Sequence, residues 1–210
     1  MANPDTPFGL KPIRHRNGAP YNGAANPYYV NSSYATALFI GDPVIKVAGG
    51  SNATRIAASG AGTFEIGTLP EVEKATAGTT NRITGVIVGF AALPTNLEQK
   101  HSPASTEAVA LVCDDPDVIF EIQADGAIPA ASMGLNAVLI YTHAGSTTTG
   151  LSGVELDTTS DAPAATAADQ LLILRAANRE DNDTTLTHAK VEVLINQHTQ
   201  NQGTVGTLGI

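Results

Sequence analysis

Short runs rich in valine and isoleucine alternate with polar turns along most of the chain, from residue 37 onward. The alternation of apolar and polar positions is clearest in Val118–Ile122 and in Lys190–Ile195. A period of two residues indicates a β-strand with one buried face. With turn residues taken as boundaries, strands are predicted at Leu38–Ile40, Val44–Val47, Thr63–Ile66, Arg82–Phe90, Ala108–Cys113, Val118–Gln123, Ala137–Tyr141, Leu171–Ala176 and Ala189–Ile195.

Apolar positions at a helical spacing are scarce. Only Glu71–Ala77 and Ala162–Ala168 are predicted to form short helices. Many short strands separated by turns are typical of sandwiches and barrels. The predicted fold class is therefore all-β, a sandwich or small barrel with an extended N-terminal arm and long loops.

Residues 1–36 follow a different pattern and are predicted to form the extended arm. Proline recurs throughout this segment, which excludes a helix and weakens any central strand. The segment also contains half of the chain's aromatic residues, whereas disordered tails are poor in them. We therefore expect the arm to dock, either on another protein or around its own domain.

The remaining chain divides into a body and a tail. The β-rich body is predicted to span residues 37–198, and residues 199–210 are predicted to form a flexible C-terminal tail. Residues 144–169 consist mostly of small and polar residues and are predicted to form a long surface loop, which is usually functional or mobile. Asn178–Asp183 is predicted to be the tip of a hairpin between two strands.

Composition narrows the class of protein. The chain has 210 residues, of which 42% are hydrophobic and 15% charged, and these values exclude a disordered chain and a coiled coil. The single cysteine, Cys113, excludes an intrachain disulfide. The sequence shows no secretory leader and no apolar run long enough to span a bilayer. We therefore expect a soluble protein made in the cytoplasm, with no membrane partner.

The charge is unevenly distributed. The whole chain has a formal net charge of −9, but the arm is basic, with Lys11, Arg14 and Arg16 against Asp5. Between Lys100 and Arg175 the chain contains acidic residues and no lysine or arginine. Binding to nucleic acid depends on basic groups that contact phosphates. An acidic body of this kind argues against a nucleic-acid partner.

Residues that carry chemistry form no recognisable motif. The five histidines are not paired at the spacing of metal ligands, and Cys113 has no thiol neighbour. The densest carboxylate cluster, Asp114-Asp115-Pro116-Asp117, is predicted to be a hairpin turn between its two flanking strands, with calcium binding and catalysis as alternatives. No catalytic, cofactor-binding or metal-binding residue is predicted, and the chain is not expected to be an enzyme.

Three stretches resemble the head proteins of tailed bacteriophages: Pro7-Phe8-Gly9-Leu10-Lys11-Pro12-Ile13, Gly41-Asp42-Pro43-Val44, and the run Arg82–Phe90. The layout is similar to that of capsid decoration proteins, also called cement or head-stabilising proteins. This resemblance implies a β-rich body, a homo-oligomer with a trimer favoured, and no cofactor or catalysis. It implies a virion protein, made in the host cytoplasm, that binds the outer capsid surface and stabilises contacts between subunits of the major capsid protein.

In that role the arm would hold a sister copy or the shell. The residues expected to form this interface are Phe8, Leu10, Lys11, Ile13, Arg14, Arg16, Tyr21, Tyr28 and Tyr29. Tyrosine is enriched at interface cores, and the basic side chains would face an acidic partner surface. Two alternatives remain: another virion component, such as a tail-tube or fibre-associated protein, and a carbohydrate- or calcium-binding β module.

Overall fold

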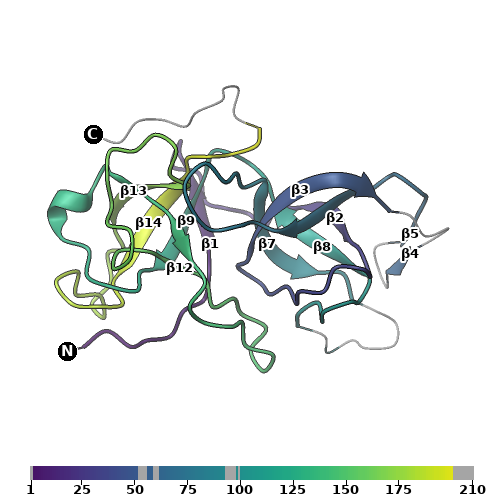
Figure 1. Ribbon diagram of the computed structural model, residues 1–210, viewed down its shortest axis with the longest axis horizontal. Coiled ribbons are helices and arrows are strands. Elements are labelled where there is room, and N and C mark those ends of the chain that lie inside the picture. Colours follow the sequence, from purple (N-terminus) through teal and green to yellow (C-terminus); the bar gives the residue numbers. More distant parts are fainter. Residues whose placement is uncertain (1, 52–55, 59–61, 93–97, 99, 201–210) are drawn as a thin grey trace.

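The protein is formed from two β-rich lobes that lie side by side along its long axis (Figure 1). The structure is a computed structural model, and it describes residues 2–51, 56–58, 62–92, 98 and 100–200. Among these residues the only helical element is η1, a 3₁₀ turn at Ala130–Ser132. The predicted all-β fold class is confirmed.

The first lobe contains an antiparallel five-stranded sheet. Its order is β1–β9–β14–β13–β10, so β1 and β10 are the edge strands. The bounds are β1 Lys11–His15, β9 Val118–Gln123, β14 Lys190–Ile195, β13 Leu171–Ala176 and β10 Asn136–Ala137. A short pair, β11 (Leu139–Ile140) and β12 (Glu155–Leu156), lies beside it.

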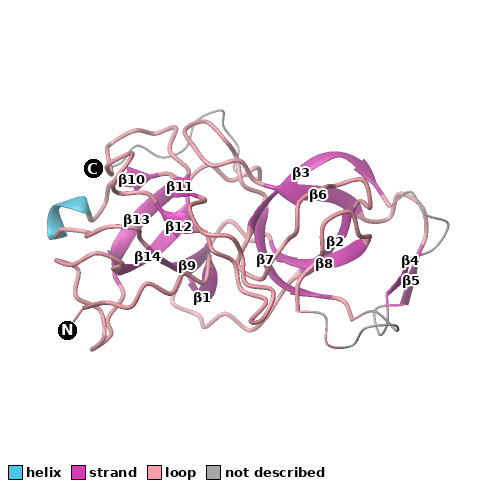
Figure 2. Ribbon diagram, turned by 60° about the horizontal axis from the view of Figure 1, so that its bottom comes forward, coloured by secondary structure: helices cyan, strands magenta, loops and turns pink. Residues whose placement is uncertain are grey.

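The second lobe is a closed five-stranded barrel (Figure 2). Its strands, in order around the barrel, are β2 Asn26–Val30, β6 Pro70–Lys74, β3 Pro43–Gly50, β7 Gly85–Phe90 and β8 Ala108–Cys113. The pairing of β2 with β6 is parallel and the other pairings are antiparallel. A small hairpin, β4 (Ile56–Ala58) and β5 (Gly62–Phe64), extends beyond the barrel.

The alternating apolar positions form the core as their period predicts. Phe120 and Ile122 of β9 and Val193 of β14 are fully buried on the inner face of the sheet. The same cluster includes Val86 and Cys113 from the barrel lobe. One core cluster therefore extends across both lobes, while the barrel also has a cluster of its own that includes Val72 and Val112.

The N-terminal segment is part of this body, and this corrects its description as a separate arm. β1 adds to the edge of the sheet beside β9, and β2 closes the barrel between β6 and β8. Pro12 lies on an edge strand, where the lack of a backbone N–H group does not interrupt the hydrogen bonds between central strands. Of the two outcomes left open by the sequence, the structure shows the segment wrapped around its own domain.

Several local predictions are wrong because pairing partners distant in the sequence override local preference. Residues 71–77 are not helical: Pro70–Lys74 forms β6, with Val72 fully buried in the barrel. Residues 162–168 contain no helix. Ala137–Tyr141 is divided between β10 and β11, and Leu38 and Ile40 make only isolated bridges.

Two connections also differ from expectation. The turn at Asp114–Asp117 joins β8 of the barrel to β9 of the sheet, so it links the lobes instead of closing a hairpin. The stretch 144–169 is not only a surface loop, because residues 152–157 are buried and include β12. The hairpin between β13 and β14, with Asn178–Asp183 in its connection, is confirmed. Of the tail predicted at 199–210, Thr199 is bonded to the body, with its N–H donating to the carbonyl of Ile83 at 3.0 Å, and residues 201–210 lie outside the described residues.

The junction between the lobes is organised around Asp42, whose side chain is fully buried. Its Oδ2 accepts a hydrogen bond from the backbone N–H of Phe39 at 2.8 Å. Its Oδ1 accepts one from the Ser152 hydroxyl at 2.6 Å and lies 2.9 Å from Nζ of Lys74. The Lys74 ammonium also lies 4.7 Å from the centre of the Tyr141 ring. One carboxylate thus joins β6, the start of β3 and the segment that leads into β12.

Two glycines allow the backbones to meet at this junction. Gly9 and Gly41 have φ values of +72° and +93°, a region that disfavours other residues. A Cβ atom on Gly9 would lie 2.4 Å from the carbonyl oxygen of Gly41, and a Cβ atom on Gly41 would lie 2.4 Å from that of Phe8. The N–H of Leu10 donates to the carbonyl of Gly41 at 2.9 Å across this contact.

We predict that Asp42→Ala lowers the free energy of unfolding by about 3–5 kcal/mol, because it removes the buried partner of the Lys74 ammonium, which is 18% exposed, and of the Ser152 hydroxyl. Urea denaturation of the full chain measures this loss. Asp117→Ala is the control, since its ion pair with Arg16 is exposed and is expected to contribute at most about 1 kcal/mol. An equal, small loss in both variants would contradict a central role for Asp42.

Candidate functional site: the groove between the lobes

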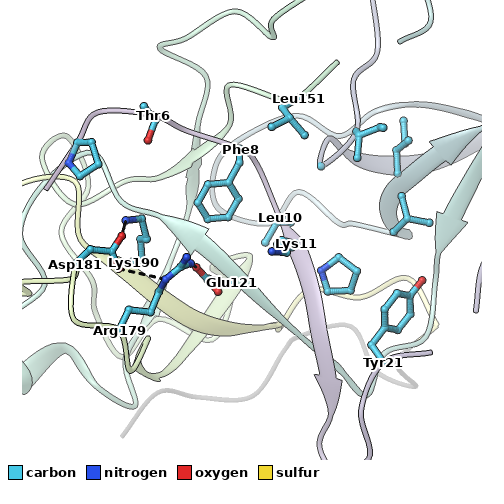
Figure 3. A pocket seen from close by; sticks show the side chains of 16 residues that line it. Thr6, Phe8, Leu10, Lys11, Tyr21, Glu121, Leu151, Arg179, Asp181 and Lys190 are labelled. Atoms are coloured by element: carbon cyan, nitrogen blue, oxygen red, sulfur yellow. Dashed lines mark hydrogen bonds and ion pairs between the residues drawn. The ribbon is translucent and has the colours of Figure 1, made fainter. Parts of the chain in front are cut away.

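A groove of about 640 Å³ lies where the two lobes meet, and we call it the inter-lobe groove (Figure 3). It takes residues from β1, β9 and β14 of the sheet and from β7 of the barrel. Most of its wall is apolar: Phe8, Leu10, Pro12, Tyr21, Ile40, Ile87, Val88 and Leu151 line it. Leu151 is 38% exposed, which is high for a large apolar side chain.

One end of the groove is charged. Arg179 pairs with Glu121, and its Nε lies 3.4 Å from Asp181, which in turn lies 3.2 Å from Nζ of Lys190. Figure 3 shows this chain of ion pairs beside the apolar wall. The hydrogen bond from Lys190 lowers the pKa of Asp181, and the hydrogen bond to Glu121 raises that of Arg179. These four charges cancel, and Lys11 adds a positive charge to the groove.

The three stretches that carry the resemblance converge on this groove. The first contributes Phe8 and Leu10, the second Gly41, and the third Ile87 and Val88. Backbone hydrogen bonds join them: Gly41 donates to Ile87 at 2.8 Å, in addition to the bond from Leu10 to Gly41. Segments distant in the sequence therefore form one continuous surface.

The predicted interface residues lie in different parts of the structure. Four of them, Phe8, Leu10, Lys11 and Tyr21, line the groove. Leu10 is 1% exposed, so it forms the groove floor and is not a free anchor. Ile13 is half-buried on β1.

Tyr28 and Tyr29 are buried in the barrel, and the expectation that they anchor a partner is corrected. Both lie on β2, whose position in a closed barrel leaves one side chain pointing inward and the other against Leu69 and Val109. Their hydroxyls donate to carboxylates, that of Tyr28 to Asp114 at 2.7 Å and that of Tyr29 to Glu107 at 3.0 Å. Burial, together with these bonds, raises both pKa values, that of Tyr29 to about 12.

The two predicted arginines are also engaged within the chain. Arg16 lies 3.3 Å from Asp117 at the surface. Arg14 pairs with Glu192 on the outer face of the sheet, and Arg175 binds the same carboxylate with its Nε at 2.8 Å. Of the three basic residues predicted to face a partner, only Lys11 has no ion pair among the described residues.

The pairing of Arg14 has a structural reason. β9 and β14 place Glu121 directly opposite Glu192, and like charges in this position are destabilising. Arginine side chains balance each carboxylate: Arg179 binds Glu121, while Arg14 and Arg175 bind Glu192. Burial opposes ionisation of Glu192, but the hydrogen bonds from the two arginines outweigh it and lower its pKa.

The carboxylates of the Asp114–Asp117 turn have partners within the chain. Asp114 accepts from Tyr28 and from Asn26 Nδ2 at 2.8 Å. Asp115 accepts from the N–H of Asp117 at 2.8 Å, and its other oxygen lies 3.3 Å from His15 Nδ1. These carboxylates stabilise the turn that links the two lobes, and each has a partner within the chain.

The remaining single residues have packing roles. Burial raises the pKa of Cys113 to about 11, so its thiol stays protonated at neutral pH. His101 stacks on Phe39 with ring centres 5.1 Å apart. Burial also lowers the pKa of His198.

Sequence reasoning missed part of the groove. Ile40, Leu151, Arg179 and Asp181 come from turns and loops that no local pattern relates to the N-terminal segment. The one available signal was the pairing of opposite charges in Asn178–Asp183, which the sequence analysis treated only as a hairpin tip.

Comparison with known proteins finds no matching family model, no matching curated protein and no matching solved structure. Among the described residues, no helix has the length and apolar character needed to cross a membrane.

We predict that Glu192→Gln lowers the free energy of unfolding at pH 7 by about 1.5–3 kcal/mol, the usual contribution of hydrogen bonds to a charged group. The folded-state pKa of Glu192 is lowered, so its contribution is full above the unfolded-state pKa of about 4.3 and disappears as the pH falls through the folded-state value. Urea midpoints measured between pH 7 and pH 3 should converge for the two proteins. A constant difference over this range would contradict the ionic role of Glu192.

Proposed function

We propose that this chain is a virion structural protein that binds the outer surface of a tailed-phage capsid and stabilises contacts between major capsid subunits. The observation that carries the proposal is the convergence of the three phage-head-like stretches on the inter-lobe groove. A surface built from these stretches is the natural candidate for the function they have in common. The proposed occupant of the groove is an extended segment of the major capsid protein.

The chemistry of the groove suits a polypeptide ligand. An apolar wall with a few placed charges is typical of sites that bind with both affinity and orientation. Phe8, Tyr21 and Leu151 offer apolar area, and Lys11 offers a positive charge to an acidic group. The ion pairs at the other end leave no uncompensated charge to disfavour an apolar segment.

The body suits repeated weak contacts. A core shared by both lobes and a fully paired buried carboxylate favour a stiff molecule that keeps its binding surface fixed. On a shell with many equivalent positions, an oligomer engages several sites at once, and the effective concentration multiplies a modest affinity. We propose a homo-oligomer, with a trimer favoured. The acidic body of the chain argues against nucleic acid as the partner.

The groove is tested with two leucines of equal exposure. Leu151 lines the groove and Leu186 lies outside it, and both side chains are 38% exposed. We predict that Leu151→Ser, alone or with Phe8→Ser, weakens co-sedimentation with shells of the cognate major capsid protein at least tenfold. Leu186→Ser should bind as the native chain does, because it leaves the groove intact.

Thermal unfolding of each variant checks that the fold is retained. Equal binding by the Leu151 and Leu186 variants would contradict the groove as the contact site. Immunogold microscopy of virions tests the wider proposal, since labelling of the tail or fibres, or no labelling of the virion, would overturn a role on the capsid. Light scattering of the purified chain measures the oligomer.

A further inference from the structure

Four ionisable side chains from distant parts of the sequence meet beside the first lobe, and none of the four lines the groove. They are Asp5 in the N-terminal segment, His143 after β11, Glu155 in β12 and His188 before β14. Asp5, His143 and Glu155 each offer one ligand atom, and these three atoms all lie within 4.8 Å of one another. His188 Nδ1 lies 3.6 Å from Asp5 Oδ1 and 4.0 Å from Glu155 Oε1.

Two atoms of this cluster are buried without a hydrogen-bond partner among the described residues. They are Glu155 Oε1 and His188 Nδ1, and they face each other. The Glu155 side chain is only 1% exposed, and an unsatisfied charged oxygen at this depth is costly. Their separation is too long for a direct hydrogen bond, which spans about 2.7–3.2 Å. An ion or a polar molecule bound between Glu155 Oε1 and His188 Nδ1 would satisfy both atoms.

The surrounding residues hold these side chains in place. The side-chain amide of Gln123, which is fully buried, donates to the carbonyls of Pro4 and His188 and accepts from the N–H of Thr6. It thereby fixes the backbone on both sides of Asp5 and ties it to His188. Asn3 adds a second tie, by donating to the carbonyl of Thr187 at 2.9 Å.

His188 itself is in an unusual conformation. Its φ is +61°, which residues with a side chain rarely adopt. Backbone strain of this kind costs about 1–3 kcal/mol and persists where the surroundings require it. The conformation here directs the imidazole toward Asp5 and Glu155.

We propose that Asp5, His143, Glu155 and His188 bind one Zn²⁺ ion. Two imidazoles and two carboxylates are ligands that zinc accepts, whereas Ca²⁺ and Mg²⁺ prefer oxygen alone. Ligand atoms placed tetrahedrally about 2.1 Å from zinc lie about 3.4 Å apart. His188 Nδ1 lies 3.6 Å from Asp5 and 4.0 Å from Glu155, close to this spacing, whereas the ligand atoms of Asp5, His143 and Glu155, which lie within 4.8 Å of one another, would move closer together on binding.

The donor arrangement also provides support for a metal ligand. His143 Nε2 lies 3.7 Å from Asp5 Oδ2, while its Nδ1 lies 2.8 Å from Glu155 Oε2. Nδ1 is therefore the imidazole nitrogen that would bind the ion together with Glu155, because a metal held by Nε2 would lie on the opposite side of the ring from this carboxylate. Thr142 donates to the same Glu155 oxygen at 3.1 Å.

The ion has a structural role. Four protein ligands close the coordination sphere, as in structural zinc sites. The ion joins the N-terminal segment, the segment after β11 and the connection before β14. The sequence predicted no metal site, because the two histidines are separated by 44 residues and neither lies at ligand spacing from another.

Isothermal titration of the untagged full chain with ZnCl₂, after dialysis against a chelator, tests the proposal. We expect saturable binding of one ion per chain and a rise in the thermal midpoint on adding zinc. Asp5→Asn and His188→Asn should each weaken zinc affinity at least tenfold. Asparagine suits position 188 because it tolerates a positive φ, so this variant keeps the backbone conformation.

His15→Asn is the matched control. His15 is 23% exposed against 25% for His188, and it too lies beside an aspartate. We expect its zinc affinity and thermal shift to equal those of the native chain. Absence of saturable binding, unchanged affinity in both the Asp5 and the His188 variants, or preference for Ca²⁺ or Mg²⁺ over Zn²⁺ would each overturn the proposal.

Discussion

The buried carboxylate of Asp42 is the interaction on which the two-lobed architecture depends. A charge removed from water is tolerated only when each oxygen is paired, and here Lys74, Ser152 and the backbone of Phe39 provide those partners. These groups come from different parts of the chain, so satisfying one charge fixes the relative position of all of them. The close contact of Gly9 with Gly41 follows from the same junction, and the groove between the lobes is its outer surface.

The second constraint is electrostatic and acts on the outer face of the sheet. The pairing of β9 with β14 places two glutamates opposite each other, and arginines from β1, β13 and the following connection neutralise them. Most of the few basic groups near the groove are therefore paired with carboxylates of the same chain. An acidic protein with its cations committed internally presents a mainly apolar groove with Lys11 as its one unpaired basic group among the described residues. This is the surface that the proposed capsid segment would contact.

The N-terminal segment connects these features. It supplies β1, β2, part of the groove wall and Asp5 of the proposed zinc site. Ordering a residue costs about 1–2 kcal/mol in backbone entropy, and burial of its aromatic side chains alone does not offset this for the whole segment. Pairing with β9, β6 and β8 satisfies its backbone groups as well. The segment is therefore a structural part of the body, and only its remaining exposed side chains are available to a partner.

The sequence by itself determined the fold class and the strands with strong local patterns. Ala108–Cys113, Val118–Gln123 and Leu171–Ala176 have the predicted bounds, because each is a short run of mostly apolar residues that favour strands and are bounded by turn residues. It also singled out Phe8, Lys11 and Tyr21 of the groove from their composition. Only the tertiary structure decided that β1, β2 and β6 are strands, since proline and charged residues mask them locally and strands distant in the sequence supply their hydrogen bonds. It alone brought Leu151 and Arg179 to the groove and His143 to His188, because contacts between distant residues depend on strand order and lobe packing, which no local period encodes.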